Sequence, residues 1–293
     1  MFERTLVMYI YAETPIHPGS GTTISGTVDL PIQRERHTEF PIIQGSSLKG
    51  VLRNGAKAVT INEKYIDKIF GEPDRIGGVT ITDARTLAFP VRTLKGVFGW
   101  ITCPLVLERY KRDLLLAGAK ADWETPKPSE DSKVIALSNS NLKANEYIYV
   151  EDLQLGVEDA EDESLEKLIE DILKGIPDSA EYKELRDKFK KDLIVMSDDV
   201  FRDLTLLTTE AATRIRIGET GTVVHGGLWS EEYLPSDTLL YSLILIPSRL
   251  EDLKPEDAKN ELIKYNEKIL QIGGDETIGK GFARLKVVSK EGR

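Results

Sequence analysis

The polar stretch between His17 and Glu39 carries side chains whose types suit phosphodiester cleavage. It holds histidines, a carboxylate and two arginines: His17, Asp29, Arg34, Arg36 and His37. Because an aspartate has an ordinary pKa of about 3.9, Asp29 is a poor general base at neutral pH and is better suited to hold a metal ion or orient a ribose hydroxyl. The stretch lacks helical periodicity, and a loop of this length is usually functional or disordered. Taken singly, each residue is better explained as a solvated loop position.

A glycine-rich segment, 273–281, resembles part of a phosphate-binding loop. Gly274 to Lys280 fits the GxxxxGK pattern, but Gly281 stands where a magnesium-binding Ser or Thr is needed. Only 12 residues follow, too few to complete a nucleotide-binding sheet, so ATP hydrolysis is excluded. A flexible loop that approaches a phosphate chain near Lys280 and Arg284 remains, with a plain turn as the alternative.

A helix is expected over 47–59, capped by Ser46 or Ser47. Free amides at a helix start attract phosphate, and Lys49 and Arg53 lie one turn apart on one face. Taken alone, this segment is better explained as an ordinary capped helix with solvated bases.

The alternating run TRIRI, residues 213–217, predicts one strand of a hairpin that turns at 218–222 and returns through 223–229. Arg214 and Arg216 fall on one face of that strand. Glu231 and Tyr233 follow the hairpin and are also compatible with a polar rim.

The order of elements predicts an α+β fold of the ferredoxin-like (βαββαβ) plan. The expected core elements are strands at 6–12, 77–83, 239–246 and 282–288 and helices at 47–59 and 255–270. Residues 90–238 form one long insertion between the second and third core strands. Within it, Pro104 begins a helix, two amphipathic helices lie within 161–192, and 193–196 is strand-like.

Composition restricts the class of protein further. The 293 residues, 40% apolar and 30% charged, are typical of a globular chain. One cysteine, Cys103, excludes an internal disulfide, and three histidines leave little for a zinc site. Residues 151–199 hold 17 acidic and 7 basic side chains, so this segment alone accounts for the net charge of −10. The apolar run 6–12 is too short to span a bilayer, and the start lacks the pattern of a signal peptide, so a cytoplasmic location is expected.

Three blocks together give a specific resemblance. They are HPGSG at 17–21, DLPIQRERHT at 29–38 and IIQGSSLKGVLR at 42–53, followed by the late glycine-rich loop. The combination resembles the RAMP superfamily of CRISPR proteins and, more closely, the repeated backbone subunit of the type III-B Cmr effector complex. The likeness extends through WSEEYLP at 229–235 to IGKGFARL at 278–285.

The resemblance implies a single RAMP domain with an RRM-like palm. Its core would lie at about 6–89 and 239–288, with an acidic helical part at 158–192 and a thumb hairpin at about 210–230. Copies would line up as a helical filament on one guide RNA, with other Cmr subunits beside them. Each copy would cut the complementary target RNA at regular intervals, by attack of the adjacent ribose hydroxyl and with a divalent metal (Mg²⁺ or Mn²⁺).

The resemblance also implies roles for particular residues. The catalytic and metal-holding aspartate falls on Asp29, the supporting histidine on His17, and the thumb-associated acid and tyrosine on Glu231 and Tyr233. The guide-backbone lysine falls on Lys49. The other expected RNA contacts are Ser46, Ser47, Arg34, Arg36, Arg53, Arg214, Arg216, Lys280 and Arg284.

Three other functions remain open from the sequence. The chain could be a purely structural guide-RNA-binding subunit in which Asp29 is idle. It could instead be a RAMP nuclease that processes guide precursors without metal through His17. A metabolic enzyme is disfavoured because the phosphate loop is incomplete and no cofactor motif is present.

Overall fold

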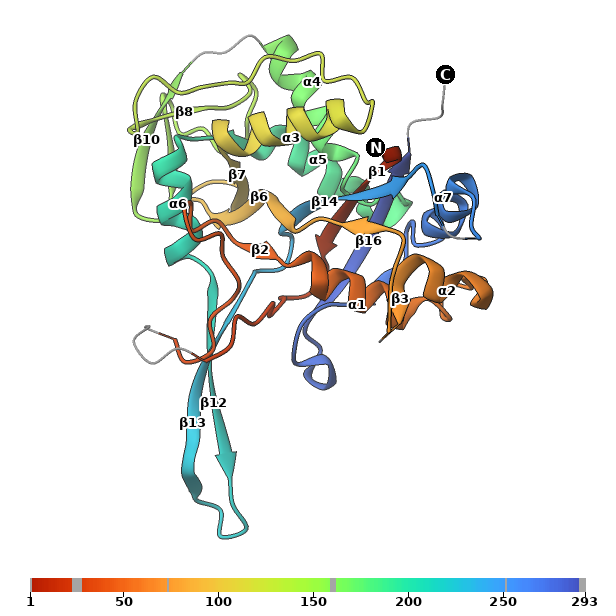
Figure 1. Ribbon diagram of the computed structural model, residues 1–293. Coiled ribbons are helices and arrows are strands. Elements are labelled where there is room, and N and C mark those ends of the chain that lie inside the picture. Colours follow the sequence, from red (N-terminus) through yellow and green to blue (C-terminus); the bar gives the residue numbers. More distant parts are fainter. Residues whose placement is uncertain (1, 23–27, 73, 159–161, 251, 290–293) are drawn as a thin grey trace.

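A mixed sheet of 12 strands runs through the molecule, and helices pack against it from both sides (Figure 1). The structure, a computed structural model, describes residues 2–22, 28–72, 74–158, 162–250 and 252–289. Residues 23–27 of the expected polar loop and 159–161 at the start of the expected acidic segment therefore lie outside the described residues.

The middle of the sheet has the strand order β16-β1-β14-β6, and every neighbouring pair is antiparallel. These strands are β1 (Phe2–Ala12), β6 (Ala84–Arg92), β14 (Leu239–Pro247) and β16 (Phe282–Ser289). The helices α1 (Gly45–Gly55) and α7 (Pro255–Ile263) connect them in the expected order, which gives a mixed α+β fold. Residues 6–12 of β1 are all buried, as expected for a central strand that is covered on both faces.

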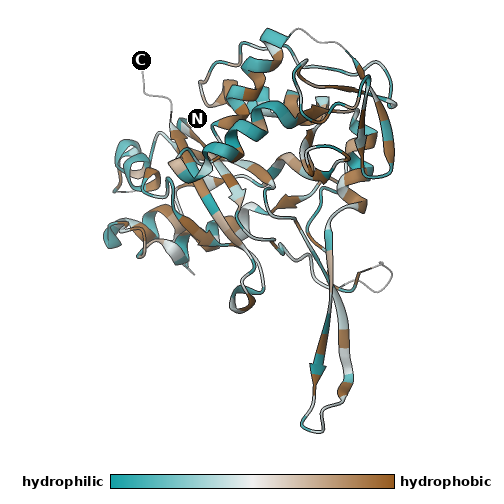
Figure 2. Ribbon diagram, turned by 180° about the vertical axis from the view of Figure 1, so that it is seen from behind, coloured by the Kyte–Doolittle hydropathy of each residue, from teal (hydrophilic) through white to brown (hydrophobic). Residues whose placement is uncertain are grey.

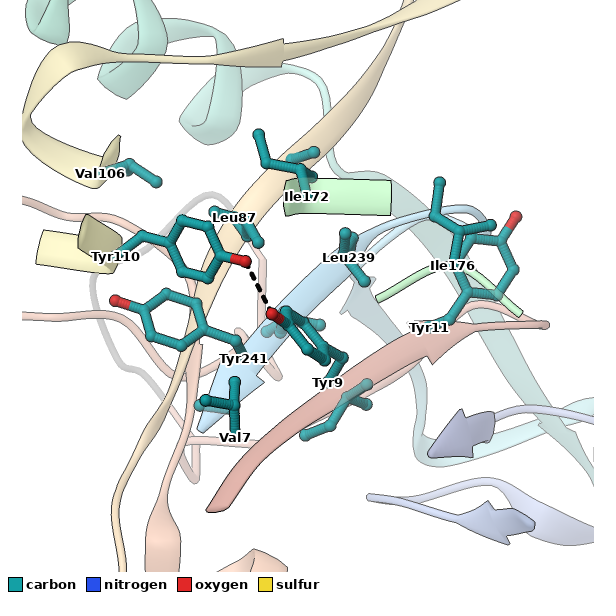
Figure 3. Close-up of a cluster of buried hydrophobic side chains, with 14 of the residues drawn as sticks. Val7, Tyr9, Tyr11, Leu87, Val106, Tyr110, Ile172, Ile176, Leu239 and Tyr241 are labelled. Atoms are coloured by element: carbon teal, nitrogen blue, oxygen red, sulfur yellow. Dashed lines mark hydrogen bonds between the residues drawn. The ribbon is translucent and has the colours of Figure 1, made fainter. Parts of the chain in front are cut away.

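Buried tyrosines join β1 to the insertion. Tyr9 and Tyr110 share a hydrogen bond of 2.7 Å between their hydroxyls (Figure 3). The Tyr110 hydroxyl also donates to the Asp171 carbonyl at 3.0 Å. Tyr241 on β14 packs edge-on against Tyr110 and donates to Asp113 at 3.1 Å. Because each phenol has a partner, these large rings are buried without leaving a hydroxyl unsatisfied.

The insertion extends the same sheet rather than standing apart from it, because β6 continues antiparallel into β7. The strand order onward is β7-β11-β8-β10-β9. Its elements are β7 (Phe98–Thr102), α3 (Pro104–Leu116), β8 (Lys133–Ile135), β9 (Tyr147–Val150), β10 (Leu153–Glu158), α4 (Asp162–Leu173), η1 (Ala180–Tyr182), α5 (Lys183–Asp192), β11 (Leu193–Val195) and α6 (Asp198–Leu207). The helix expected from Pro104 and the two amphipathic helices are confirmed; α6 was not predicted.

Smaller elements complete the chain around the core. They are β2 (Ile42–Ile43), α2 (Glu63–Phe70), β3 (Gly71–Glu72), β4 (Arg75–Ile76), β5 (Thr80–Ile81), β15 (Ile269–Gln271) and η2 (Glu276–Ile278).

The strand expected at 77–83 was placed too early. Only Thr80–Ile81 pairs with β14, and the long strand beside β14 is β6. The ladder breaks between them because Thr82 uses its hydroxyl to accept the Leu243 amide at 2.9 Å. Asp83 turns to the start of α1 instead and accepts the Gly45 amide at 2.8 Å.

The expected N-cap of α1, Ser46 or Ser47, was also wrong, because Asp83 turns to the start of this helix. Gln44 is the N-cap residue, and the acceptor for the Gly45 amide comes from Asp83 on the neighbouring chain segment. The helix therefore begins two residues earlier than predicted and ends at Gly55, and Ser46 and Ser47 lie exposed in its first turn.

The helix expected at 255–270 ends at Ile263. The next residues form a turn, and Glu267 and Lys268 exchange backbone hydrogen bonds with Leu285 on β16. Ile269 then belongs to strand β15 and is 47% exposed, whereas a continuous helix was expected to bury it.

A long hairpin projects from the body (Figure 1). It consists of β12 (Glu210–Ile217) and β13 (Val223–Tyr233), at the place that the TRIRI pattern indicates. Figure 2 shows hydrophobic segments on it, although it stands away from the core. Its exposed apolar side chains are Ile215, Ile217, Val223 and Leu228.

Among the described residues, no helix combines the length and the apolar character that crossing a membrane requires.

The packing at the start of α1 gives a prediction about stability. A Cβ added at Gly45 would lie 2.4 Å from the Ile81 carbonyl oxygen, while one added at Gly50 meets nothing within 4 Å. We expect Gly45→Ala to lower the free energy of unfolding by about 1–3 kcal/mol and Gly50→Ala to raise it by about 0.5–1 kcal/mol. Denaturant unfolding of both variants measures this; equal effects would contradict the close approach at Gly45.

Candidate active site at the base of the hairpin

The polar N-terminal loop docks along the free edge of β13. Ile16 pairs antiparallel with Leu234, and Leu30 pairs parallel with Glu231. The Leu30 amide donates to the Ser230 carbonyl at 3.0 Å, and the Glu232 amide donates to the Leu30 carbonyl at 3.0 Å. Backbone pairing therefore brings Ile16, just before the loop, and Leu30, within it, to the strand that carries Glu231 and Tyr233.

Asp29 is exposed, and its carboxylate is oriented by one residue. Its Oδ2 accepts hydrogen bonds from the amide and the hydroxyl of Ser230, both at 2.8 Å. These two bonds, the backbone one first, lower the pKa of Asp29 below its ordinary value. Asp29 is therefore an ionised, positioned and accessible carboxylate at neutral pH.

A hydrogen-bonded cluster occupies the base of the hairpin around Tyr233, whose side chain is fully buried. The Tyr233 hydroxyl contacts Glu231 Oε2 and lies 2.7 Å from Asp275 Oδ2. Arg214 donates to the Tyr233 hydroxyl at 2.8 Å and to Glu231 at 3.1 Å. Trp229 Nε1 donates to the second oxygen of Glu231 at 2.6 Å.

The pKa values of Glu231 and Tyr233 are shifted in opposite directions from their ordinary values. Burial opposes ionisation of Glu231, but hydrogen bonds from Trp229, Tyr233 and Arg214 outweigh it and lower the pKa of Glu231 to about 2. Burial, together with the two neighbouring carboxylates, raises the pKa of Tyr233. At neutral pH the cluster therefore holds an ionised Glu231 and a protonated phenol.

His17 packs into the same cluster. Its Nδ1 lies 2.6 Å from the Glu232 carbonyl oxygen, which can only accept, so Nδ1 carries a proton. The imidazole centroid lies 5.5 Å from that of Tyr233. The Gly274 amide donates to the His17 carbonyl at 3.1 Å, so the glycine-rich loop closes over this residue.

The expected catalytic residues divide between the two faces of β13. Ser230 and Glu231 are consecutive residues of a regular strand, so their side chains point to opposite faces. Asp29 is bound to Ser230, whereas Glu231 and Tyr233 share the opposite face, and His17 lies against Tyr233. The strand register therefore places Asp29 beside one face of β13 and Glu231 and Tyr233 on the other.

Arg34 has a structural role that the sequence did not reveal. It donates to Glu232 at 2.6 Å and to the Thr205 and Glu39 carbonyls at 3.0 Å each. Glu232 is buried and also accepts the Ile32 amide at 3.0 Å and the Thr209 hydroxyl at 2.8 Å. Because side chains alternate along a strand, the sequence itself indicates that the consecutive residues Glu231 and Glu232 point to opposite faces. Arg36, by contrast, is exposed.

Two of the expected RNA-binding residues of α1, Lys49 and Arg53, line an open groove beside the β3–β4 hairpin. Lys49 donates to the Val79 carbonyl at 2.7 Å, and burial lowers its pKa. Arg53 pairs with Asp67 at 2.7 Å. Ser46 and Ser47 are exposed at the helix start, where Asp83 already accepts one amide.

The remaining expected RNA contacts do not form one patch. Arg214 is bent back onto Glu231, while Arg216 lies beside a register shift in the hairpin and is exposed. Lys280 lies 4.9 Å above the Tyr233 ring. Arg284 donates to Glu13 at 2.9 Å and to the Tyr182 hydroxyl at 3.2 Å, so it joins β16 to the insertion.

Within the described residues, no group of three or more Asp, Glu, His or Cys side chains is arranged to hold a metal ion. Mg²⁺ does not need such a cage, because one or two carboxylates and substrate phosphates commonly bind it. The exposed carboxylate of Asp29 fits that kind of shared site.

Comparisons with known proteins agree with this architecture. A family model described as the RAMP superfamily matches residues 9–284. The chain is 47% identical over 298 residues to the CRISPR system Cmr endoribonuclease Cmr4 of Pyrococcus furiosus, covering 99% of this chain and 98% of that one. It is 27% identical over 300 residues to the CRISPR system CMR subunit Cmr4 of Saccharolobus solfataricus, covering 95% and 94%. The crystal structure of oligomeric Cmr4 from Pyrococcus furiosus is similar with a TM-score of 0.78 and 39% identity, covering 98% and 100%.

Glu232 gives a prediction about the docking of the loop. Glu232→Ala leaves the Ile32 amide and the Arg34 guanidinium without their buried acceptor, so we expect a loss of about 3 kcal/mol in the free energy of unfolding. Glu219→Ala, at the exposed hairpin turn, serves as the control and should change it by less than about 0.5 kcal/mol. Denaturant unfolding measures both, and matching values would refute the role of Glu232.

The low pKa of Glu231 gives a prediction about acid stability. Because its pKa of about 2 lies below the ordinary value of about 4.3, ionised Glu231 stabilises the fold at neutral pH, and this contribution is lost as the pH falls from about 4 towards 2. The stability advantage of wild type over Glu231→Gln should therefore shrink over that range. Urea unfolding across pH measures it, with Glu276→Gln, at an exposed glutamate, as the matched control.

Proposed function

The chain belongs to the RAMP superfamily, and on that premise we propose that it is a repeated backbone subunit of a type III-B CRISPR Cmr complex that cuts guide-paired target RNA. The resemblance found in the sequence blocks is confirmed at the level of the family. Support for the activity comes from the Pyrococcus furiosus relative, named an endoribonuclease, which is 47% identical over nearly the whole chain. Support for self-assembly comes from the solved structure named as oligomeric, which this chain also matches along its length.

In this proposal the sheet β16-β1-β14-β6 with α1 and α7 is the ferredoxin-like palm, and the β12–β13 hairpin is the thumb. The chain is one domain, with an insertion at about 90–238 that packs onto the palm through the tyrosines of Figure 3. The exposed apolar side chains of the thumb suit insertion between stacked bases, which costs a few kcal/mol and displaces a nucleotide.

Base pairing supplies sequence recognition in a guided effector, so the protein needs only to hold the backbone. The side chains available for that are Lys49, Arg53, Arg36, Arg216 and Lys280, with the exposed start of α1 at Ser46 and Ser47. In this proposal the partners of the subunit are the guide RNA, the target RNA, further copies of the chain and other Cmr subunits. The complex acts in the cytoplasm.

The observation that carries the nuclease proposal is the state of Asp29. It is ionised, fixed by Ser230 and exposed at the root of the thumb, where a displaced nucleotide would lie. In the reaction, the 2′-oxygen of a ribose bonds to the adjacent phosphorus while the bond to the 5′-oxygen breaks. The products are a 2′,3′-cyclic phosphate and a 5′-hydroxyl, and the proton lost from the 2′-hydroxyl is balanced by one gained at the 5′-oxygen. Asp29 orients the attacking hydroxyl for in-line displacement.

A divalent ion, Mg²⁺ or Mn²⁺, would be shared between Asp29 and RNA phosphates. When bound, it would stabilise the negative charge that develops on the phosphoryl oxygens.

The experiment assembles the chain with guide RNA and the other Cmr subunits and supplies labelled complementary RNA with magnesium or EDTA. Wild type should give evenly spaced, metal-dependent cuts. Asp29→Asn should cut at least about 100-fold more slowly while binding target normally, because the oriented carboxylate is lost. Asp131→Asn, an exposed aspartate of the insertion, is the matched control and should cut like wild type.

Other outcomes separate the alternatives. Cuts that persist in Asp29→Asn would place catalysis elsewhere. Normal target binding without any cutting by wild type would establish a purely structural subunit. Metal-independent cleavage of a guide precursor by the isolated chain would support the processing nuclease.

A further inference from the structure

The glycine-rich loop is joined to the root of the hairpin through the side chain of Asp275. Resting on the proposed function, we propose that Asp275 is a positioning residue for target cleavage. It holds Tyr233 and Arg214 against the body, which fixes the angle of the hairpin and thereby the position of Asp29.

The contacts place Asp275 at the junction of loop and hairpin. Its Oδ2 lies 2.7 Å from the Tyr233 hydroxyl and 3.9 Å from Arg214 Nη2. Arg214 comes from β12 and Tyr233 from β13, and Arg214 bonds to the Tyr233 hydroxyl at 2.8 Å. One carboxylate of the body therefore meets side chains from both strands of the hairpin.

Charge and proton counts show why this carboxylate matters to the cluster. The Tyr233 hydroxyl has one proton to donate, and two carboxylates, Glu231 and Asp275, lie within hydrogen-bonding distance of it. The guanidinium of Arg214 and the ammonium of Lys280, 4.9 Å above the ring, offset the two negative charges. Loss of Asp275 leaves the Tyr233 hydroxyl bonded within the hairpin alone, while the ring keeps its contacts with His17 and Lys280.

The backbone around Asp275 is a rigid support. Asp275 itself has φ of 65°, in the left-handed region. Gly273 has φ of 85°, and a Cβ there would lie 2.2 Å from the His17 carbonyl oxygen. The Gly281 amide donates to the Pro15 carbonyl at 2.8 Å. The loop is thus fixed on residues 15–17, the start of the segment that leads to Asp29.

The strand β13 connects this cluster to Asp29. Glu231 faces the cluster, and its neighbour Ser230 holds the Asp29 carboxylate on the other face. A swing of the hairpin root would therefore displace the carboxylate that orients the ribose. A displacement of about 1 Å at a reacting centre can slow a reaction about 100-fold.

The test uses variants chosen for their backbone. Asp275→Gly removes the carboxylate without the strain that alanine would suffer at positive φ, and Asp275→Asn keeps an oxygen acceptor there. Tyr233→Phe removes the hydroxyl at the other end of the bond. Glu276→Ala, at an exposed position in the same loop, is the control.

In the assembled complex, single-turnover cutting should fall about tenfold in Asp275→Gly and in Tyr233→Phe. The double variant should be no slower than Tyr233→Phe alone, because that substitution already removes the hydrogen bond to Asp275. Asp275→Asn should recover most of the rate, Glu276→Ala should match wild type, and target affinity should not change.

A second measurement reports the hairpin angle without any cutting. Spin labels at Glu219→Cys, in the hairpin turn, and Lys64→Cys, on α2, give the distance distribution in the full chain. Cys103 is fully buried and its pKa is raised, so it stays unlabelled. The distribution should broaden in Asp275→Gly and stay narrow in Asp275→Asn.

An unchanged distribution in Asp275→Gly would overturn the proposal, whether or not cutting falls. So would additive losses in the double variant. If wild type does not cut at all but the distribution broadens, the proposed nuclease function fails while the positioning of the hairpin by Asp275 stands.

Discussion

The structure depends on the pairing of the N-terminal loop with the edge of β13. Four backbone segments meet there, because β13 pairs with β12 on one side and with residues around Ile16 and Leu30 on the other. A two-stranded hairpin is marginal by itself in water, so the added partners stabilise its root. The same pairing places Asp29 and His17, which are far from the hairpin in sequence, beside the strand that carries the acidic cluster.

At the root of the hairpin, the two faces of strand β13 have different roles. Side chains alternate, so Glu232 and Glu231 serve different faces although they are consecutive. Glu232 and Ser230 face the loop and hold Arg34 and Asp29. Glu231 faces the cluster of Tyr233 and Arg214. An exposed reactive carboxylate is thereby supported from behind by a buried polar network, whose members are hydrogen-bonded to one another.

The body gives this root a firm base. Both faces of β1 are buried, and the tyrosines of β1, α3 and β14 link the central strands to the insertion through hydroxyl hydrogen bonds. Because the insertion continues the same sheet from β6 into β7, it adds core rather than a separate lobe. The hairpin leaves the body after α6 and returns into β14, so one of its ends follows a helix of the insertion and the other enters the central sheet.

The sequence by itself determined the order of core strands and helices, the amphipathic helices of the insertion and the hairpin at TRIRI, because hydrophobic periodicity and turn residues are local signals. The blocks around His17, Asp29 and Lys49 also determined the family. Only the tertiary structure decided where helices and strands end, as at α1, whose first amide is accepted by Asp83, and at α7, whose last expected turn instead enters β15 and pairs with β16. It also decided that Asp29 and Glu231 lie on opposite faces, that Arg34 and Arg284 are held by carboxylates, and that Asp275 meets Tyr233. These facts follow from register and from contacts between distant segments, for which a single sequence carries no local signal.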